Sequence, residues 1–373
     1  MSSTRWPNQY LDSMRKVTDP VADEVVDALF EQGEVGAVNA LMHELIANDQ
    51  LVPDLLPSVV QRYLKETGAI PEWADSEKIK RAEGFFARNG LLITTTLTCA
   101  SLPRCYACAN GVQVLYLTAR LETDTKRRIG ETGQMVLDVM APGGLAPLGA
   151  GIRDAQKVRL MHAAVRHLIL RSGRWNEEWG APVNQEDLSG TLMSFSWTPL
   201  DCLRRLGIAV EPQDGEAYIH AWNVVGHLMG MRPEMLPANM AEAEELIDLI
   251  GQRHFAASEA GREMTGALIE MVEETIPGTA FKGLPHTLIR FFLGDQIADL
   301  IGVPEDDWTR KLIGPMGKAF GIIEGEEDRS RILARVGEQF GREFNKGLSW
   351  VARGGQRPPF EIPAVLRERW NIN

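Results

Sequence analysis

Residues 158–169 read VRLMHAAVRHLI, and this stretch decides how the rest of the chain is interpreted. At 3.6 residues per turn, one side of a helix here combines His162 with apolar side chains. Those side chains are Val158, Met161, Val165, Leu168 and Ile169. A buried imidazole without a partner costs about 1–3 kcal/mol, so the ring must bond to something. The pattern leaves two partners open: a backbone carbonyl in an ordinary helical core, or a buried metal or haem iron.

The helical period continues along most of the chain. Capping residues and prolines such as Asp19-Pro20 mark helix starts, and no alternating Val, Ile and Thr runs joined by Asn-Gly or Asp-Gly turns occur. Helices are predicted over 20–32, 34–48, 53–66, 75–88, 90–101, 111–121, 124–140, 154–172, 185–207, 214–231, 237–252, 257–274, 279–296, 305–323 and 328–349. The segment 354–360 contains two glycines and two prolines and is predicted to lie extended. The sequence therefore predicts an all-α fold in one large helical domain.

Composition limits the classes of partner. The chain has 373 residues and a net charge of -12, which argues against nucleic acid and anionic membranes, because both require clustered basic residues. The apolar stretch 91–102 is shorter than the roughly 20 residues of a membrane span, so we predict a buried helix and no integral membrane segment. Residues 1–15 show no export signal, which predicts a cytoplasmic protein. The oligomeric state stays open.

Other polar residues fall on apolar helix faces. Arg128 and Thr132 lie one turn apart, and an inward guanidinium needs either an acidic partner in the chain or a carboxylate of a cofactor. His220 and His227 share a face but are about 10 Å apart along a helix, too far to bind one metal together. Each is either a core histidine with a local hydrogen-bond partner or part of a cavity wall.

The four cysteines give a weak signal. Cys105 and Cys108 have a recognisable spacing, but neither a second pair for zinc nor the following histidine of covalent haem attachment is present. Free thiols are the expectation. No Glu-x-x-His of a di-iron bundle and no Gly-x-Ser-x-Gly elbow occurs.

Five motifs in order resemble the latex-clearing protein, or rubber oxygenase, family, which includes fungal oxygenases of mycophenolic acid biosynthesis. They are Ser101-Leu-Pro-Arg-Cys-Tyr-Ala107, Arg128-x-x-x-Thr132, Val158-Arg-Leu-Met-His162-Ala-Ala-Val-Arg166, Asn184-Gln-Glu-Asp-Leu-Ser-Gly-Thr191 and His220-Ala-Trp-Asn-Val-Val-Gly-His227. The likeness runs from about residue 85 to 230. It implies an N-terminal helical extension over 1–80, an oxygenase core over 81–235, and helices over 236–373 that complete the same domain.

The resemblance implies a globin-like core that holds non-covalent haem b, with His162 as the iron ligand and O2 as co-substrate. Arg128 and Thr132 would then lie in or beside the haem pocket, and Arg166 would pair with a propionate or brace the ligand helix. The second nitrogen of the His162 ring should donate to an acceptor. Thr191, His220 and His227, which belong to matched motifs, are expected to contact the cofactor.

Two departures from the family pattern affect the expected chemistry. Glu131 stands where the rubber-cleaving branch has a lysine, so the iron is either open to oxygen or faced by a carboxylate that accepts a proton. The acidic base of that branch falls near Val112, so the base is either missing or supplied elsewhere. The missing export signal favours a soluble or membrane-derived isoprenoid, or another unsaturated lipid, over solid rubber.

The implied function is haem-dependent cleavage or oxygenation of a carbon-carbon double bond by O2. Three alternatives stay open. A haem sensor or carrier would need no substrate cavity, and a haem monooxygenase or peroxygenase acting on a small metabolite would place one oxygen atom in its product instead of two. The third is a helical scaffold that has lost its cofactor.

Overall fold

A computed structural model describes residues 5–119, 125–276, 282–305 and 326–352. The helices are α1 Asn8–Met14, α2 Pro20–Gln32, α3 Val35–Glu44, α4 Ser58–Glu66, α5 Ser76–Thr96, α6 Leu102–Ala107, α7 Val112–Ala119, α8 Thr125–Met140, α9 Gly151–Arg171, α10 Gln185–Arg205, α11 Pro212–Leu228, α12 Met240–His254, α13 Glu259–Thr275, α14 Leu284–Leu293, α15 Asp295–Leu300 and α17 Glu326–Ala352. Within the described ranges, extended pairing is limited to one isolated bridge between Cys108 and Phe255. The predicted all-α fold is confirmed.

The structure corrects some predicted boundaries. The helices predicted over 75–88 and 90–101 are one element, because α5 runs to Thr96 and continues as a π-helix from Leu97 to Ser101. Gly90 lies inside α5 and does not end the helix. A Cβ at this position would meet no atom within 4 Å. The helix predicted over 279–296 is interrupted at Gly294, whose φ of 80° lies in the left-handed region. Residues 279–281, 306–323 and 354–360 of the sequence predictions lie outside the described residues.

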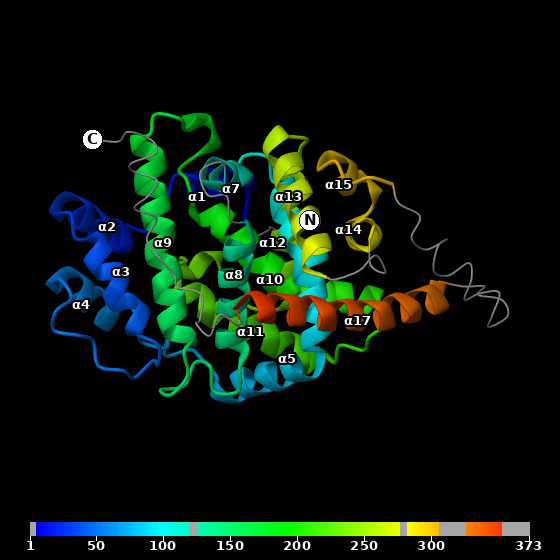
Figure 1. Cartoon of the computed structure of the whole chain (residues 1–373), viewed down its shortest axis with the longest axis horizontal. Coiled ribbons are helices and arrows are strands. Elements are labelled where there is room, and N and C mark those ends of the chain that lie inside the picture. Colours follow the sequence, from blue (N-terminus) through cyan, green and yellow to red (C-terminus); the bar gives the residue numbers. More distant parts are fainter. Residues whose placement is uncertain (1–4, 120–124, 277–281, 306–325, 353–373) are drawn as a thin grey trace.

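Helix α9 joins two hydrophobic clusters. Its first half, with Ala155 and Val158, belongs to the larger cluster, which extends from Trp6 to Phe344. Its second half, with Leu168, packs in a smaller cluster with α2, α3 and α4. Figure 1 shows these three N-terminal helices gathered beside α9, with α13 near the middle of the molecule and α14 and α15 on the side away from α9.

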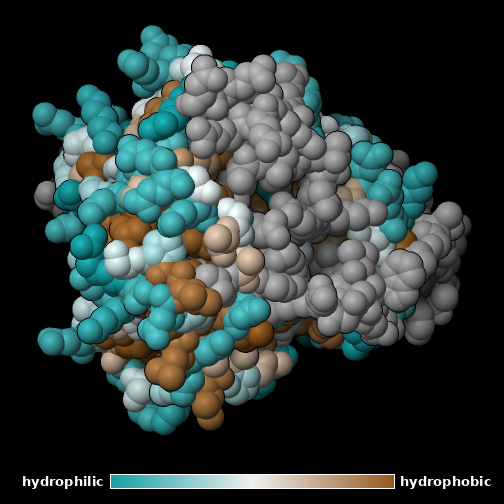
Figure 2. All heavy atoms as spheres, turned by 60° about the vertical axis from the view of Figure 1, so that its left-hand side comes forward, coloured by the Kyte–Doolittle hydropathy of each residue, from teal (hydrophilic) through white to brown (hydrophobic). Residues whose placement is uncertain are grey.

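The surface mixes polar and apolar residues. Figure 2 shows apolar side chains gathering in the lower half of one face. Leu51, Leu55 and Leu148 are among the exposed large apolar residues. In the described ranges, no helix combines the length and apolar character that a membrane span requires.

Candidate active site

A cavity of about 300 Å³ lies among the central helices, within the size range of small-ligand sites. Its wall includes residues of α6 to α12, together with the segment 229–231. Apolar side chains such as Met135, Val158, Val165 and Phe195 form most of the lining. The cavity therefore suits a ligand with a hydrocarbon part.

His162 lies in this wall, on α9. Its Nδ1 is buried and has no hydrogen-bond partner among the described residues. Burial lowers the pKa of the imidazole to about 4, and the positive charge of Arg166 adds to this effect. The ring is therefore neutral at pH 7, which is the form that binds a metal ion. In the described residues, it belongs to no cluster of three or more metal-ligating side chains.

Helix α8 brings three of the predicted residues to the same cavity: Arg128, Glu131 and Thr132. Arg128 donates to the carbonyl of Leu115 at 3.3 Å, and the Thr132 hydroxyl donates to the carbonyl of Arg128 at 2.9 Å. The buried Glu131 adds a carboxylate to the lining. This wall thus offers an anion-binding group, a hydroxyl and a proton acceptor.

Arg166 is buried but is not part of the cavity lining. Its Nε and Nη2 donate to the carbonyls of Pro182 and Val183, both at 2.9 Å, and Nη1 bonds to Asp23. One turn before His162, Arg159 donates to Asp19 at 2.5 and 2.7 Å. The two arginines tie α9 to α2 and to the segment before α10, which fixes the orientation of the helix that carries His162.

His220 and His227 are half-buried and lie outside the lining. Both rings meet Trp73 edge-on, with centroid distances of 5.6 and 6.2 Å. His220 Nε2 accepts from the backbone N–H of Asp75 at 2.8 Å. Another residue of α11, Trp222, lines the cavity instead. The two histidines thus anchor the segment before α5, a role that their spacing left open.

Of the candidate catalytic and cofactor-binding residues, five meet at one cavity: Arg128, Glu131, Thr132, His162 and Thr191. Three lie outside its lining: Arg166, His220 and His227. Val112, where the acidic base of the rubber-cleaving branch was expected, lines the cavity as an apolar residue.

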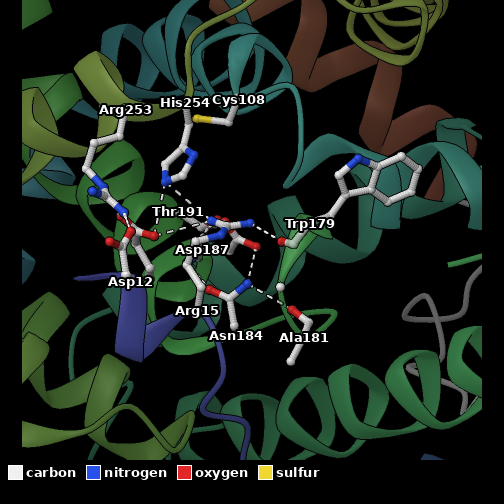
Figure 3. Close-up of polar contacts among 12 residues, drawn as sticks. Asp12, Arg15, Cys108, Trp179, Ala181, Asn184, Asp187, Thr191, Arg253 and His254 are labelled. Carbon is white, nitrogen blue, oxygen red and sulfur yellow. Dashed lines mark hydrogen bonds and ion pairs between the residues drawn. The ribbon is translucent and has the colours of Figure 1, made fainter. Parts of the chain in front are cut away.

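Sequence reasoning missed Asp187, a carboxylate in the same wall. Its oxygens accept from Arg15 Nη1 at 3.0 Å and from Asn184 Nδ2 at 2.6 Å (Figure 3). Burial raises the pKa of Asp187, and the positive charge of Arg15 opposes that rise. The signal was present in the motif Asn184-Gln185-Glu186-Asp187, but only the fold shows that Asp187 reaches the cavity while Glu186 is buried elsewhere.

Glu186 is the centre of an ion-pair cluster beside the cavity. It accepts from Arg253 Nε at 2.8 Å, His254 Nε2 at 3.0 Å and Arg15 Nη1 at 3.3 Å. Burial alone would raise the pKa of Glu186, but the bonds from His254 and Arg253 outweigh it and lower the pKa. Figure 3 shows how Arg15 connects this cluster to Asp187. The cluster holds the start of α10 against α1 and the end of α12.

Comparison with known proteins supports the resemblance seen in the motifs. Residues 97–319 match the model of the family described as "ER-bound oxygenase mpaB/B'/Rubber oxygenase, catalytic domain". The chain is 30% identical to the rubber oxygenase of Streptomyces sp. (strain K30) over 304 residues, which cover 80% of this chain and 73% of that protein.

The fold agrees with this match. The structure of latex clearing protein LCP in the closed state aligns with a TM-score of 0.74 and 27% sequence identity, over 86% of this chain and 90% of that one. The family match, the relative and the all-α fold around one apolar cavity lead to the same conclusion. The chain belongs to the mpaB and rubber oxygenase family, and it is an oxygenase.

Proposed function

We propose that this oxygenase uses haem b and O2 to cleave or oxygenate a carbon-carbon double bond in an unsaturated isoprenoid or similar apolar chain. One observation carries the proposal: the neutral ring of His162 lies in the wall of an apolar cavity without a hydrogen-bond partner at its buried Nδ1. A polar atom that is buried without a partner costs free energy, so its presence calls for an explanation. Ligation of haem iron is a common role of such a histidine.

The residues present fit a haem. His162 would ligate the iron through a ring nitrogen, and Arg128 would bind a propionate, because a guanidinium pairs well with carboxylates. Non-covalent binding is consistent with Cys105 and Cys108, which are free thiols. When bound, haem supplies the activation of O2 toward an electron-rich double bond.

The remaining groups act through the chain's own chemistry. Apolar side chains such as Met135, Val165 and Phe195 exclude water and hold the hydrocarbon chain of the substrate. Thr132 presents a hydroxyl oxygen to the same space, and Glu131 supplies a carboxylate able to accept a proton. Arg166 and Arg159 act indirectly, by holding α9 in place.

The chemistry of the lining supports an isoprenoid substrate. The relative is named for the oxygenation of rubber, and most side chains around this cavity are apolar, as a hydrocarbon chain requires. Isoprenoids match the cavity because they combine methyl-substituted double bonds with an otherwise apolar surface.

The absorption spectrum of the purified protein tests the cofactor. We expect a strong Soret band that is lost or displaced in His162→Ala. His227→Ala is the matched control, since this histidine is half-buried but lies outside the cavity lining, and its spectrum should equal that of the wild type. An unchanged spectrum in His162→Ala would contradict the ligand assignment.

Product analysis under ¹⁸O₂ tests the reaction. Cleavage of the double bond should place one labelled oxygen in each of two carbonyl products, whereas a monooxygenase would label one position. A haem-loaded protein that converts no unsaturated isoprenoid or lipid would contradict the oxygenation of this substrate class while leaving haem binding intact.

A further inference from the structure

One wall of the cavity is polar, and its hydrogen-bonding capacity is one-sided. Asp187, Thr191 and Ser194 follow one another at spacings of four and three residues along α10, so they share a side of that helix. All three line the cavity. We refer to these three residues as the acceptor strip.

The hydroxyl protons of the strip are already used. Thr191 Oγ1 donates to the carbonyl of Asp187, and Ser194 Oγ donates to the carbonyl of Gly190, both at 2.8 Å. Each hydroxyl has one proton, so what remains on these oxygens is lone pairs. The Asp187 carboxylate receives one bond on each oxygen and can accept more. Toward a ligand, the strip therefore offers hydrogen-bond acceptors.

The neighbouring thiols take up little of this capacity. Cys105 is within hydrogen-bonding reach of the hydroxyls of Thr191 and Ser194, and burial raises the pKa of the thiols of both Cys105 and Cys108, so they stay protonated. The single proton of Cys105 can occupy only one of the lone pairs on these hydroxyl oxygens. Cys108 Sγ points to the carbonyl of Arg104 at 3.9 Å. A protonated thiol is a weak donor and a weak acceptor.

Arg104 is a donor in the same lining, and its buried Nε has no hydrogen-bond partner among the described residues. The rest of its guanidinium faces the end of α12, with Cζ 5.3 Å from the ring centroid of Phe255 and Nη2 3.6 Å from a carboxylate oxygen of Asp248. A ligand carboxylate would have to compete with Asp248 and approach the negative charge of Asp187 as well.

We infer that the substrate has a hydrogen-bond donor at its polar end, as an unsaturated alcohol does, and that this hydroxyl donates to the acceptor strip. The inference deepens the proposed function and rests on it for the fate of the bound molecule. A pure hydrocarbon would displace water from Asp187, Thr191 and Ser194 without replacing the hydrogen bonds that water donates to them. An ether or aldehyde could accept from Arg104 Nε but would bring only a further acceptor to the strip. An alcohol satisfies the strip while its chain fills the apolar part of the cavity.

Calorimetric binding to the purified, haem-loaded protein tests this, with geraniol, geranyl methyl ether and geranic acid as probes. The three differ mainly at the polar end. We expect the alcohol to bind about tenfold more tightly than the ether, the size of effect given by one hydrogen bond to an acceptor of this kind. Equal binding of alcohol and ether would overturn the inference, and tighter binding of the acid would assign the polar end to Arg104.

The variant Thr191→Val measures what the acceptor strip contributes to binding, apart from the rest of the cavity. Thr191 is exposed, so the variant should fold, and we expect its preference for alcohol over ether to fall several-fold while ether binding stays the same. Thr191→Ser should keep the preference. The matched control is Thr94→Val, because the Thr94 hydroxyl also bonds to a carbonyl four residues earlier but does not line the cavity.

A preference that survives in Thr191→Val and in Asp187→Asn would also overturn the inference. These outcomes are independent of the Soret band and of the oxygen labels. Failure of the strip to distinguish the probes therefore leaves the proposed oxygenation intact. If no haem binds, the same three probes are compared on the purified protein without it.

Discussion

At the residue scale, two buried titratable groups show how surroundings select a role. His162 faces an apolar cavity, where burial lowers its pKa and keeps the ring neutral. Glu186 is fully buried, but Arg15, Arg253 and His254 surround it and keep it ionised. The surroundings of His162 leave a ring nitrogen available to a ligand. The negative charge of Glu186, by contrast, is balanced by positive groups within the protein.

Glu186→Gln should therefore destabilise the protein at neutral pH. The substitution removes the buried carboxylate that Arg15, Arg253 and His254 share, while Asp187 and Asp12 remain as partners of the two arginines, and we expect a cost of about 3 kcal/mol. Because the pKa of Glu186 is lowered in the folded state, its contribution is present above the unfolded pKa of about 4.5 and is lost as the pH falls through the folded value. Urea unfolding at pH 7 and at pH 4 should show a smaller difference between wild type and variant at the lower pH.

Glu178→Gln is the control for that measurement. Glu178 is exposed just before α10, so its substitution should change the unfolding free energy by less than about 0.5 kcal/mol at either pH. A Glu186→Gln variant as stable as this control would show that the cluster does not hold α10.

At the element scale, glycines permit the long helices to approach. A Cβ on Gly341 of α17 would lie 2.4 Å from the carbonyl oxygen of Leu91 on α5. One turn earlier, Thr95 Oγ1 donates to the carbonyl of Gly337 at 2.8 Å. This contact explains why α5 continues through Gly90, because α17 and α11 pack along it and support the continuous helix.

Gly341→Ala should therefore destabilise the protein, although alanine is the better helix former. We expect a loss of about 2 kcal/mol from the forced separation of α17 and α5, measured by thermal or urea unfolding. Gly266→Ala is the matched control on α13, where an added Cβ meets nothing within 4 Å, and it should stabilise by up to about 1 kcal/mol. Equal effects of the two substitutions would argue against the close crossing.

At the scale of the whole molecule, α9 makes the two hydrophobic clusters interdependent. It contributes Ala155 and Val158 to the larger cluster and Leu168 and Ile169 to the smaller one, with His162 between them. Loosening either cluster should disturb the helix that carries the proposed ligand. The division into 1–80, 81–235 and 236–373 stays a prediction, and the larger cluster draws residues from all three parts.

Leu168→Ala tests this coupling. Leu168 is fully buried, so we expect a loss of about 3 kcal/mol, and because α9 serves both clusters, unfolding should remain a single transition. Tryptophan fluorescence and far-ultraviolet circular dichroism should give the same midpoint. Leu170→Ala is the control, since Leu170 is 54% exposed on the same helix. Two separate transitions in Leu168→Ala would contradict the coupling.

The sequence by itself determined the helical class and much of the site. The helical period and caps predicted most helices, and the motif order identified the family and selected His162, Arg128 and Thr132, because local spacing is enough to place side chains on a helix face. Glu131, the residue that departs from the family pattern, also proved to line the cavity.

Only the tertiary structure decided which of these faces meet. It placed Arg166, His220 and His227 outside the cavity lining and brought Asp187 into it, although all four belong to matched motifs. The physical reason is that a helix period fixes the direction of a side chain only relative to its own axis. The partner that a side chain meets depends on how α8, α9, α10 and α11 pack, and that packing is set by contacts between residues far apart in the chain.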